Sequence, residues 1–173
     1  LRADFILANP PFNISDWWHP SLEGDARWTF GTPPQGNANF AWMAHVHHHL
    51  SANGIAGVVM ANGSMSSMQS GEGDIRKAMV QQDAVDAIVA LPDQLFYNTG
   101  IFTYVWLVTN RKTPERHGKV QLIEVKKGPL LGDLQAISLS STESTESILK
   151  VGQSLVMNPP ADLESGQLVS IKE

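Results

Sequence analysis

The sequence contains no cysteine, no long hydrophobic run and no excess of basic residues, and each absence excludes a class of protein. Without cysteine there are no disulfides and no thiolate metal sites, which permits a cytoplasmic location. No stretch approaches the roughly 20 apolar residues of a membrane span, and the chain does not begin with a signal peptide. We therefore expect a soluble, cytoplasmic protein that does not bind a membrane.

The charge balance argues against a protein that binds DNA by electrostatics alone. The net charge is -5, whereas neutralisation of phosphates by lysine and arginine supplies most non-specific DNA affinity. Half of the 12 basic residues nevertheless fall in one short segment. They are Arg111, Lys112, Arg116, Lys119, Lys126 and Lys127. We interpret this basic segment as a solvated hairpin turn, and a phosphate-facing patch is the alternative.

The length of 173 residues and the 42% hydrophobic content are enough for one core with a small appendage. No Gly-x-Gly loop follows any expected strand, so the sequence shows no cofactor-binding fingerprint. The chain begins directly in an apolar strand without room for a cap or a preceding helix. We therefore expect it to be a piece of a longer polypeptide.

The most informative stretch is an apolar run that ends on an amide, two prolines and an aromatic ring. Residues 4–8 predict a buried strand, and Asn9, Pro10, Pro11 and Phe12 follow at its carboxyl end. Ligands bind at the carboxyl ends of strands in open α/β sheets. The Asn9 amide oxygen and the Pro10 carbonyl can accept hydrogen bonds from an amino group while Phe12 stacks on the ring that carries it. Enzymes that act on flipped bases require such a grip.

The next segments suggest a binding loop and a helix. Residues 13–36 form an expected long loop with four large aromatic side chains, which either stack on bases or attach the loop to the protein body. We favour attachment for each of them. A helix is expected over residues 38–50, with Asn37 as its N-cap. Several of its histidines have metal-ligand spacing, but without a neighbouring carboxylate we favour a solvated histidine face that includes His45.

The later segments alternate between expected strands and helices. Strands at residues 55–60 and 85–91 enclose a flexible loop at 61–71 and a helix at about 73–82, with Arg76 pointing outward. This alternation predicts crossover connections and a parallel sheet.

The last third of the chain is expected to complete the sheet and then change character. Residues 101–109 and 119–125 predict an antiparallel hairpin attached to the sheet edge. Beyond residue 128 a Ser/Thr/Glu run at 138–147 indicates a linker or disorder. We therefore divide the chain into a core at 1–127 and a linker with a small appendage of unknown role at 128–173.

Five segments, in order and spacing, resemble the modification subunit of type I restriction-modification systems, an N6-adenine-specific DNA methyltransferase. The resemblance covers roughly residues 3–125. Its segments are Asn9 to Phe12, Pro33 to Phe40, Gly57 to Gly63, Gly71 to Lys77, and Leu91 to Gly100 with Ile101. It implies an α/β fold with part of a three-layer, Rossmann-like methyltransferase sheet, mainly parallel with an antiparallel hairpin at one edge. Residues 1–127 would form the C-terminal half of that core.

The resemblance also implies the chemistry and the partners. S-adenosylmethionine would be the methyl donor, adenine in double-stranded DNA the substrate, and the specificity and restriction subunits the protein partners. Catalysis is assigned to Asn9, Pro10, Pro11 and Phe12, substrate binding to Phe12, Asn37, Asn39 and Phe40, and a contact with the cofactor to Asn9 and Pro10. Asn9 and Pro10 would accept hydrogen bonds from adenine N6.

The family's main cofactor motifs precede the catalytic strand and lie outside this chain, so only the acceptor half of a site is expected. A sheet that begins at its catalytic strand exposes that strand's outer edge. Another chain then supplies the missing half, or the piece self-associates, and we expect no activity from the isolated chain. The alternatives are a non-catalytic interaction module from a truncated methyltransferase and an amino-group methyltransferase acting on RNA or protein.

Overall fold

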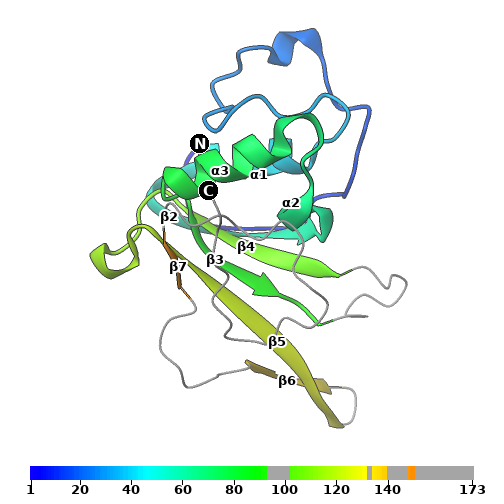
Figure 1. Cartoon of the computed structure of the whole chain (residues 1–173), viewed down its shortest axis with the longest axis vertical. Helices are drawn as coiled ribbons and strands as arrows, with labels where there is room; N and C mark the ends of the chain where they lie inside the picture. Colours follow the sequence, from blue (N-terminus) through cyan, green and yellow to red (C-terminus); the bar gives the residue numbers. More distant parts are fainter. Residues whose placement is uncertain (93–101, 132–133, 140–147, 151–173) are drawn as a thin grey trace.

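The protein folds as a twisted sheet with its helices on one face (Figure 1). The computed structural model describes residues 1–92, 102–131, 134–139 and 148–150. The elements are, in chain order, β1 Ala3–Ala8, η1 Pro20–Leu22, α1 Asn39–His48, β2 Leu50–Ala61, α2 Gly63–Ser66, η2 Gln69–Gly71, α3 Glu72–Gln81, β3 Val85–Ala90, β4 Thr103–Thr109, η3 Pro114–Arg116, β5 Lys119–Leu131, β6 Leu134–Leu139 and β7 Ile148–Lys150, where η marks a short 3-10 helix. No helix in these residues is long and apolar enough to cross a membrane.

The strands follow the order β1-β2-β4-β3-β5-β6, and β7 pairs with β5. β1 is parallel to β2, and β3 is parallel to β5. β4 lies between β2 and β3 and runs antiparallel to both. β1, β2, β3 and β5 therefore point the same way, which confirms the predicted α/β class.

The predicted hairpin of residues 101–109 with 119–125 is wrong. β4 lies inside the sheet, where Thr103 to Thr109 pair with β2, and β5 pairs with β3 instead. A hairpin does lie at one edge, but β5 and β6 form it. Trp106 and Val108 of β4 are inaccessible to solvent. Such burial is reached when strands flank β4 on both sides and the helix layer covers it, which explains its position inside the sheet.

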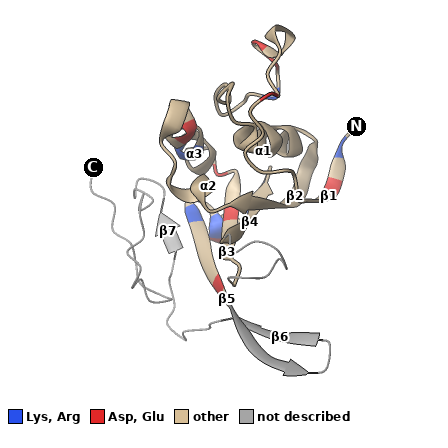
Figure 2. Cartoon of the chain, turned by 90° about the vertical axis from the view of Figure 1, so that its right-hand side faces the viewer, with Lys and Arg blue, Asp and Glu red and all other residues tan. Residues whose placement is uncertain are grey.

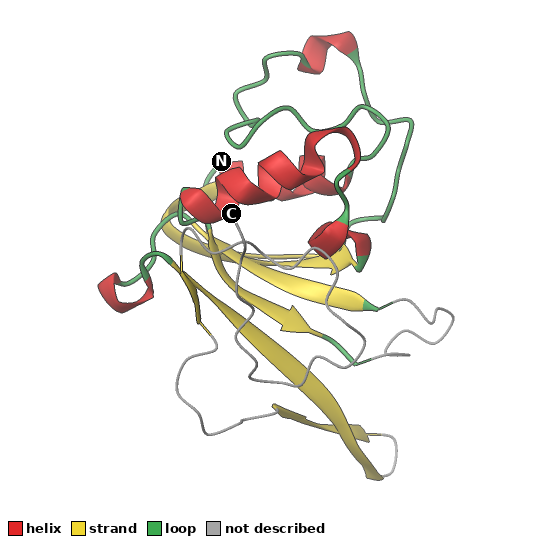
Figure 3. Ribbon diagram, viewed as in Figure 1, coloured by secondary structure: helices red, strands yellow, loops and turns green. Residues whose placement is uncertain are grey.

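The helices share one face because both crossovers have the same direction. The chain passes from β1 through α1 to β2, and from β2 through α3 to β3, each time toward the same side of the sheet. Crossovers of one hand that advance in one direction place their helices on the same face (Figure 3). The core lies between this helix layer and the sheet. Its most fully buried side chains include Phe40, Met43, Leu50, Met60, Met79, Ile88 and Trp106.

Two local predictions differ from the structure around the first crossover. The helix expected over residues 38–50 spans Asn39–His48, and β2 begins at Leu50 rather than at 55. Gly54, whose dipeptide with Asn53 resembles a turn signal, lies within β2 instead. A Cβ atom at Gly54 would stand 2.7 Å from the Ala3 carbonyl oxygen, so this glycine allows β1 to approach β2.

The loop expected at residues 61–71 contains α2 and η2. This segment is attached to β4, because the Trp106 indole Nε1 donates a hydrogen bond of 3.3 Å to the buried hydroxyl of Ser64. The division of the chain at residue 127 stays a prediction, although β5 continues across it. The segments at 93–101 and 140–147, and the appendage from 151, lie outside the described residues.

The face of the sheet opposite the helices is bare at β1. Phe5 and Leu7 are 81% and 91% exposed, while Ile6 and Ala8 alternate with them and pack against the core. β1 also ends the order of described strands, so its outer edge has no strand partner in this part of the chain. The outer edge of β1 is open among the described strands, as predicted, and a further structural layer could cover this surface. The prediction of a buried strand at residues 4–8 is wrong for this face, because Phe5 and Leu7 alternate with the packed residues and point away from the helix layer.

The alternation in β1 predicts unequal effects of two neighbouring substitutions. Ile6→Ala should lower the free energy of unfolding by about 2 kcal/mol, because it removes side-chain atoms packed on the core. Leu7→Ala should change it by less than about 0.5 kcal/mol because the side chain is exposed. Urea denaturation of the two variants measures the difference, and equal losses would contradict the register of β1.

Candidate active site at the carboxyl edge of the sheet

The carboxyl ends of three parallel strands meet at one edge of the sheet. β1 ends before Asn9, β2 ends before Asn62, and β3 ends before Leu91. β4 begins at this same edge, where Thr103 pairs with Ala61. The ends of several strands therefore meet where α/β proteins bind their ligands.

The predicted catalytic residues lie at this edge. Ala8, the last residue of β1, pairs with Val58, so the ladder to β2 fixes the position from which Asn9 departs. Asn9 is exposed, and Phe12 is half-buried. The two prolines between them restrict the backbone to a narrow range of φ, so the amide and the ring are held in few relative orientations.

A group of three asparagines holds the chain directly after Phe12. The Asn13 backbone N–H donates to Asn39 Oδ1 at 2.9 Å, and Asn39 Nδ2 donates to Asn13 Oδ1 at 2.9 Å. Asn37 Nδ2 donates to the same Asn13 oxygen at 3.3 Å, and the Ala38 N–H donates to the Ile14 carbonyl at 2.9 Å. The motif alone does not identify Asn13 as a functional residue, although the sequence has an asparagine directly after the motif and two more at the start of α1.

The structure separates the three residues predicted to contact substrate near α1. Asn37 is half-buried, and its Oδ1 accepts a hydrogen bond of 2.9 Å from the Asn39 N–H, which supports its predicted capping role although Ala38 holds the N-cap position. Asn39 is 7% exposed and bound to Asn13. Phe40 is 1% exposed and meets Trp106 edge-to-face at 6.3 Å between ring centroids. Phe40 therefore anchors α1 to the sheet rather than offering its ring to a base.

The aromatic side chains of residues 13–36 attach this loop to the body. Trp17 Nε1 donates to the Pro34 carbonyl at 3.1 Å, and Trp28 Nε1 donates to the Leu22 carbonyl at 2.7 Å. Phe30 is buried against the ring of His47. The predicted attachment is confirmed for these aromatic residues.

An ion pair and a histidine hold the same loop over α1. Arg27 Nη2 lies 2.7 Å from Asp25 Oδ2, and the hydrogen bonds from Arg27 hold the pKa of that carboxyl well below its usual range. Arg27 Nη1 also lies 2.9 Å from His45 Nδ1, which must therefore be unprotonated to accept the hydrogen bond. Burial, and then the nearby His49 and Arg27, lower the pKa of His45.

The histidines of α1 are half-buried, so the predicted solvated face is wrong in part. The loop covers His45, and His47 Nε2 lies 3.2 Å from the Thr109 carbonyl oxygen. His49 Nδ1 lies 2.8 Å from the His45 carbonyl oxygen. No group of three or more histidine, cysteine, aspartate or glutamate side chains could hold a metal ion in the part of the chain that the structure describes.

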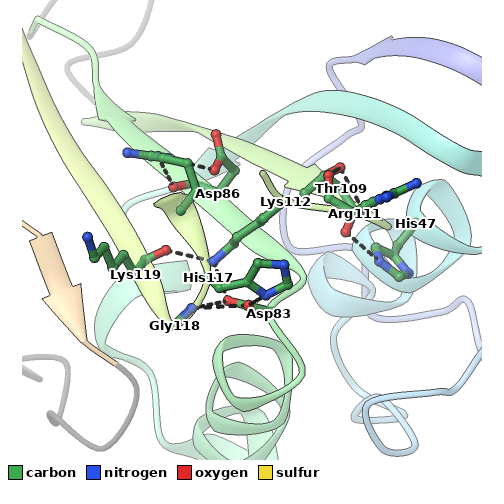
Figure 4. Close-up of polar contacts among 10 residues, drawn as sticks. His47, Asp83, Asp86, Thr109, Arg111, Lys112, His117, Gly118 and Lys119 are labelled. Carbon is green, nitrogen blue, oxygen red and sulfur yellow. Dashed lines mark hydrogen bonds and ion pairs between the residues drawn. The ribbon is translucent and has the colours of Figure 1, made fainter. Parts of the chain in front are cut away.

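Arg111, Lys112, Arg116 and Lys119 of the basic segment lie at the opposite edge of the sheet, because β4 runs away from the candidate site and β5 begins there. Lys126 and Lys127 lie further along β5, which runs parallel to β3 back toward the other edge. Figure 2 shows the positions of the charged residues on the described chain. Two side chains of the basic segment are bound to carboxylates. Lys112 Nζ lies 2.7 Å from Asp83 Oδ1 with its side chain fully buried, and it donates to the Lys119 carbonyl at 2.6 Å (Figure 4). Arg116 Nε lies 3.0 Å from Asp86 Oδ1.

Asp83 is the centre of this contact. It has a positive φ of 61° and also accepts hydrogen bonds from the Gly118 N–H at 3.0 Å. Burial alone would raise the pKa of Asp83, but the hydrogen bonds from Lys112 and Gly118 lower it overall. Lys112 and Arg116 therefore fasten the connection between β4 and β5, and neither is free to face a phosphate.

Arg76 also differs from its predicted outward position. Its side chain is 4% exposed, with the guanidinium carbon 6.0 Å from the centroid of the Phe40 ring. Arg76 Nη2 lies 3.6 Å from the Met68 sulfur. The loop after β2 covers this part of α3, which periodicity in the helix alone does not reveal, and burial lowers the pKa of Arg76.

Residues 1–151 match a family model described as N-6 DNA Methylase. The chain belongs to this family. It is 50% identical over 126 residues to the type I restriction enzyme HindI methylase subunit of Haemophilus influenzae, a match that covers 73% of this chain and 28% of that protein. It is 42% identical to the MjaIX methylase subunit of Methanocaldococcus jannaschii, over 73% of this chain and 24% of that protein.

A solved member of the same group has the same fold. The type I restriction-modification methyltransferase subunit from Streptococcus thermophilus matches with a TM-score of 0.63 and 31% identity, over 71% of this chain and 26% of that one. The N-6 DNA methylase chain described here thus spans about a quarter of the length of these relatives. The Rossmann-like methyltransferase sheet implied by the sequence is confirmed.

The hydrogen bond between Arg27 and His45 predicts acid sensitivity. The pKa values of His45, His47 and His48 are lowered in the folded state, so the unfolded chain binds more protons as the pH falls below about 6.5. The contribution of these histidines to the free energy of unfolding should be fully present above about pH 6.5. It should decrease as the pH falls from there toward the lower pKa values of the folded state. Urea denaturation at several pH values measures this, and His45→Gln, which keeps an acceptor without titrating, should show a smaller decrease.

The buried lysine predicts a structural role for the basic segment. Lys112→Met should lower the free energy of unfolding by about 3 kcal/mol, because it leaves the Asp83 carboxylate without its ammonium partner. Lys77→Met is the matched control, since Lys77 is exposed on α3, and it should stay within about 0.5 kcal/mol of the wild type. Similar small losses of unfolding free energy for both variants in urea denaturation would contradict the structural role and favour a phosphate-facing Lys112.

Proposed function

We propose that this chain carries the base-binding half of a DNA methyltransferase that transfers a methyl group to adenine N6 within a type I restriction-modification complex. One observation carries the proposal: Asn9, Pro10, Pro11 and Phe12 lie at the carboxyl end of a sheet strand in a chain of the N-6 DNA methylase family. This edge can receive a flipped base, because the carboxyl ends of three parallel strands meet there.

The residues at this edge have the chemistry for an amino-group acceptor. Asn9 Oδ1 and the Pro10 carbonyl would accept the two hydrogen bonds of adenine N6, which directs the nitrogen lone pair away from the ring plane. Positive charge builds on N6 as its bond to the methyl carbon forms, and both oxygens stabilise that charge before N6 releases a proton. Phe12 would stack on the base and keep it out of the duplex.

S-adenosylmethionine would supply the methyl group when bound. The residues present fit one side of its site, because Asn9 is exposed at the end of β1 next to the open edge of the sheet. In the described ranges, no strand lies beyond β1 to offer a nucleoside-binding loop. Asn9 and Pro10 would therefore contact the donor, and a further part of the assembly would hold most of it.

The same reasoning assigns DNA recognition to partners. The chain has a net charge of -5, and Lys112 and Arg116 of its basic segment lie at the far edge, bound to carboxylates. Double-stranded DNA would therefore be gripped mainly by other parts of the complex, with the specificity and restriction subunits as expected partners. The HindI relative is itself named a methylase subunit.

Replacement of the motif asparagine tests the proposal. In an assembly that methylates DNA, Asn9→Ala should lower the rate of adenine methylation by at least about a hundredfold, because a transition-state acceptor for N6 is lost. Transfer of a radioactive methyl group to a duplex that contains the recognition site measures the rate. Asn53→Ala is the control, since Asn53 is exposed and distant from the motif, and it should leave the rate unchanged.

Two results would redirect the assignment. An unchanged rate in Asn9→Ala would identify the chain as a non-catalytic interaction module. Methyl transfer to RNA or protein, without transfer to DNA, would assign it to another class of amino-group methyltransferase.

A further inference from the structure

We propose that Asn13 and Asn39 form an interlock that positions the catalytic motif, so that both are positioning residues for methyl transfer. The inference rests on the proposed function for its catalytic consequence. It rests on the hydrogen bonds between residues 13–14 and 37–39 for its structural content. Neither asparagine needs to contact a base for this role.

The motif is suspended between two fixed points. Upstream, Ala8 is the last residue of β1 in register with β2. Downstream, Asn13 is bound to Asn39 by two hydrogen bonds of 2.9 Å. Only Asn9, Pro10, Pro11 and Phe12 lie between these points, and two of them are prolines with restricted backbones. The position of the downstream point therefore decides where the Asn9 amide and the Phe12 ring stand relative to each other.

The pairing of the two asparagines is reciprocal. The Asn13 N–H and Oδ1 are joined to the Oδ1 and Nδ2 of a single Asn39 amide group. Two bonds to one planar group fix direction as well as distance. Asn39 is 7% exposed and Asn13 lies at the surface, so the two bonds are partly buried.

The backbone of Asn13 also restricts which residue can stand there. Its φ is 57°, in the left-handed region, where asparagine, aspartate and glycine are tolerated best. Glycine would keep the backbone but lose the oxygen that Asn39 and Asn37 donate to. Asparagine meets both requirements, since its side chain supplies that acceptor.

The other half of the interlock is attached to the rigid body of the protein. Asn39 is the first residue of α1, and the next residue, Phe40, packs against Trp106 in the centre of the sheet. The backbone N–H of Asn39 is bound to Asn37 Oδ1 at 2.9 Å, which stabilises the first turn of the helix. The position of the motif is thereby fixed by contacts with the core and not by the long loop that follows it.

Methylation kinetics in the assembled enzyme test the interlock. Asn39→Ala should lower kcat by about tenfold or more with little change in KM for DNA, because a displaced motif binds the duplex but aligns N6 poorly. Asn39→Asp keeps an acceptor for the Asn13 N–H but places a carboxylate oxygen against Asn13 Oδ1, so its kcat should also fall. Asn13→Asp keeps the left-handed backbone and the acceptor oxygens, and it should retain most of the wild-type kcat.

Asn110→Ala is the matched control for a purely structural loss. Asn110 Nδ2 donates to the Leu50 and Ser51 carbonyls at 3.1 and 2.9 Å, at the edge of the sheet opposite the motif. It should leave kcat unchanged even where it lowers stability as much as Asn39→Ala does. Equal losses of kcat in both variants would overturn the inference, as would a wild-type kcat in Asn39→Ala.

Hydrogen exchange measured on the same assembly separates this inference from the proposed function. Peptides that cover residues 9–16 should exchange about tenfold faster in Asn39→Ala than in the wild type, while peptides from β2 stay unchanged. If Asn9→Ala retains full methylation but exchange is accelerated in this way, the proposed function fails and the interlock stands. Unchanged exchange at 9–16 overturns the interlock whatever the methylation assay shows, and if Asn39→Ala does not fold, the comparison of Asn39→Asp with Asn13→Asp decides.

Discussion

The parallel ladder between β1 and β2 is the constraint on which the candidate site depends. It is the sole strand pairing that β1 makes among the described strands, and it ends one residue before Asn9. Gly54 permits the close approach of the two strands at the other end of the ladder. Since β2 is itself fixed from both sides, by β1 and by β4, the direction in which the motif leaves the sheet is set by the most buried part of the protein.

The parts of the fold that were predictable from the sequence depend on short-range patterns. An apolar run broken by two prolines identifies β1 and the motif behind it, and the 3.6-residue period of Ile75 and Met79 identifies α3. The position of β4 was not predictable in this way. Strands adjacent in sequence pair often enough that β4 and β5 resemble a hairpin, and only the long-range requirement to bury Trp106 from both sides places β4 between β2 and β3.

The candidate site shows the same division. Asn9 to Phe12 are recognisable because four consecutive residues carry the chemistry, whereas Asn13 and Asn39 act across 26 positions of sequence. Phe40 matches a family segment, but its role comes from its contact with Trp106. Arg76 resembles an outward-facing helical residue until Phe40 and the loop at Met68 cover it. Side chains that work through a distant partner leave no local pattern for a sequence to display.

The placement of β4 also has a consequence for how the chain is made. Among the described strands, β2 and β3 are joined only through β4, which follows both of them in the sequence. When β1, α1, β2, α3 and β3 have left the ribosome, β1 and β2 can pair, but β3 still lacks both of its neighbours, β4 and β5. The central sheet can form only after Thr109 has emerged. The support of Asn9 to Phe12 is therefore completed by a strand that is synthesised about a hundred residues later.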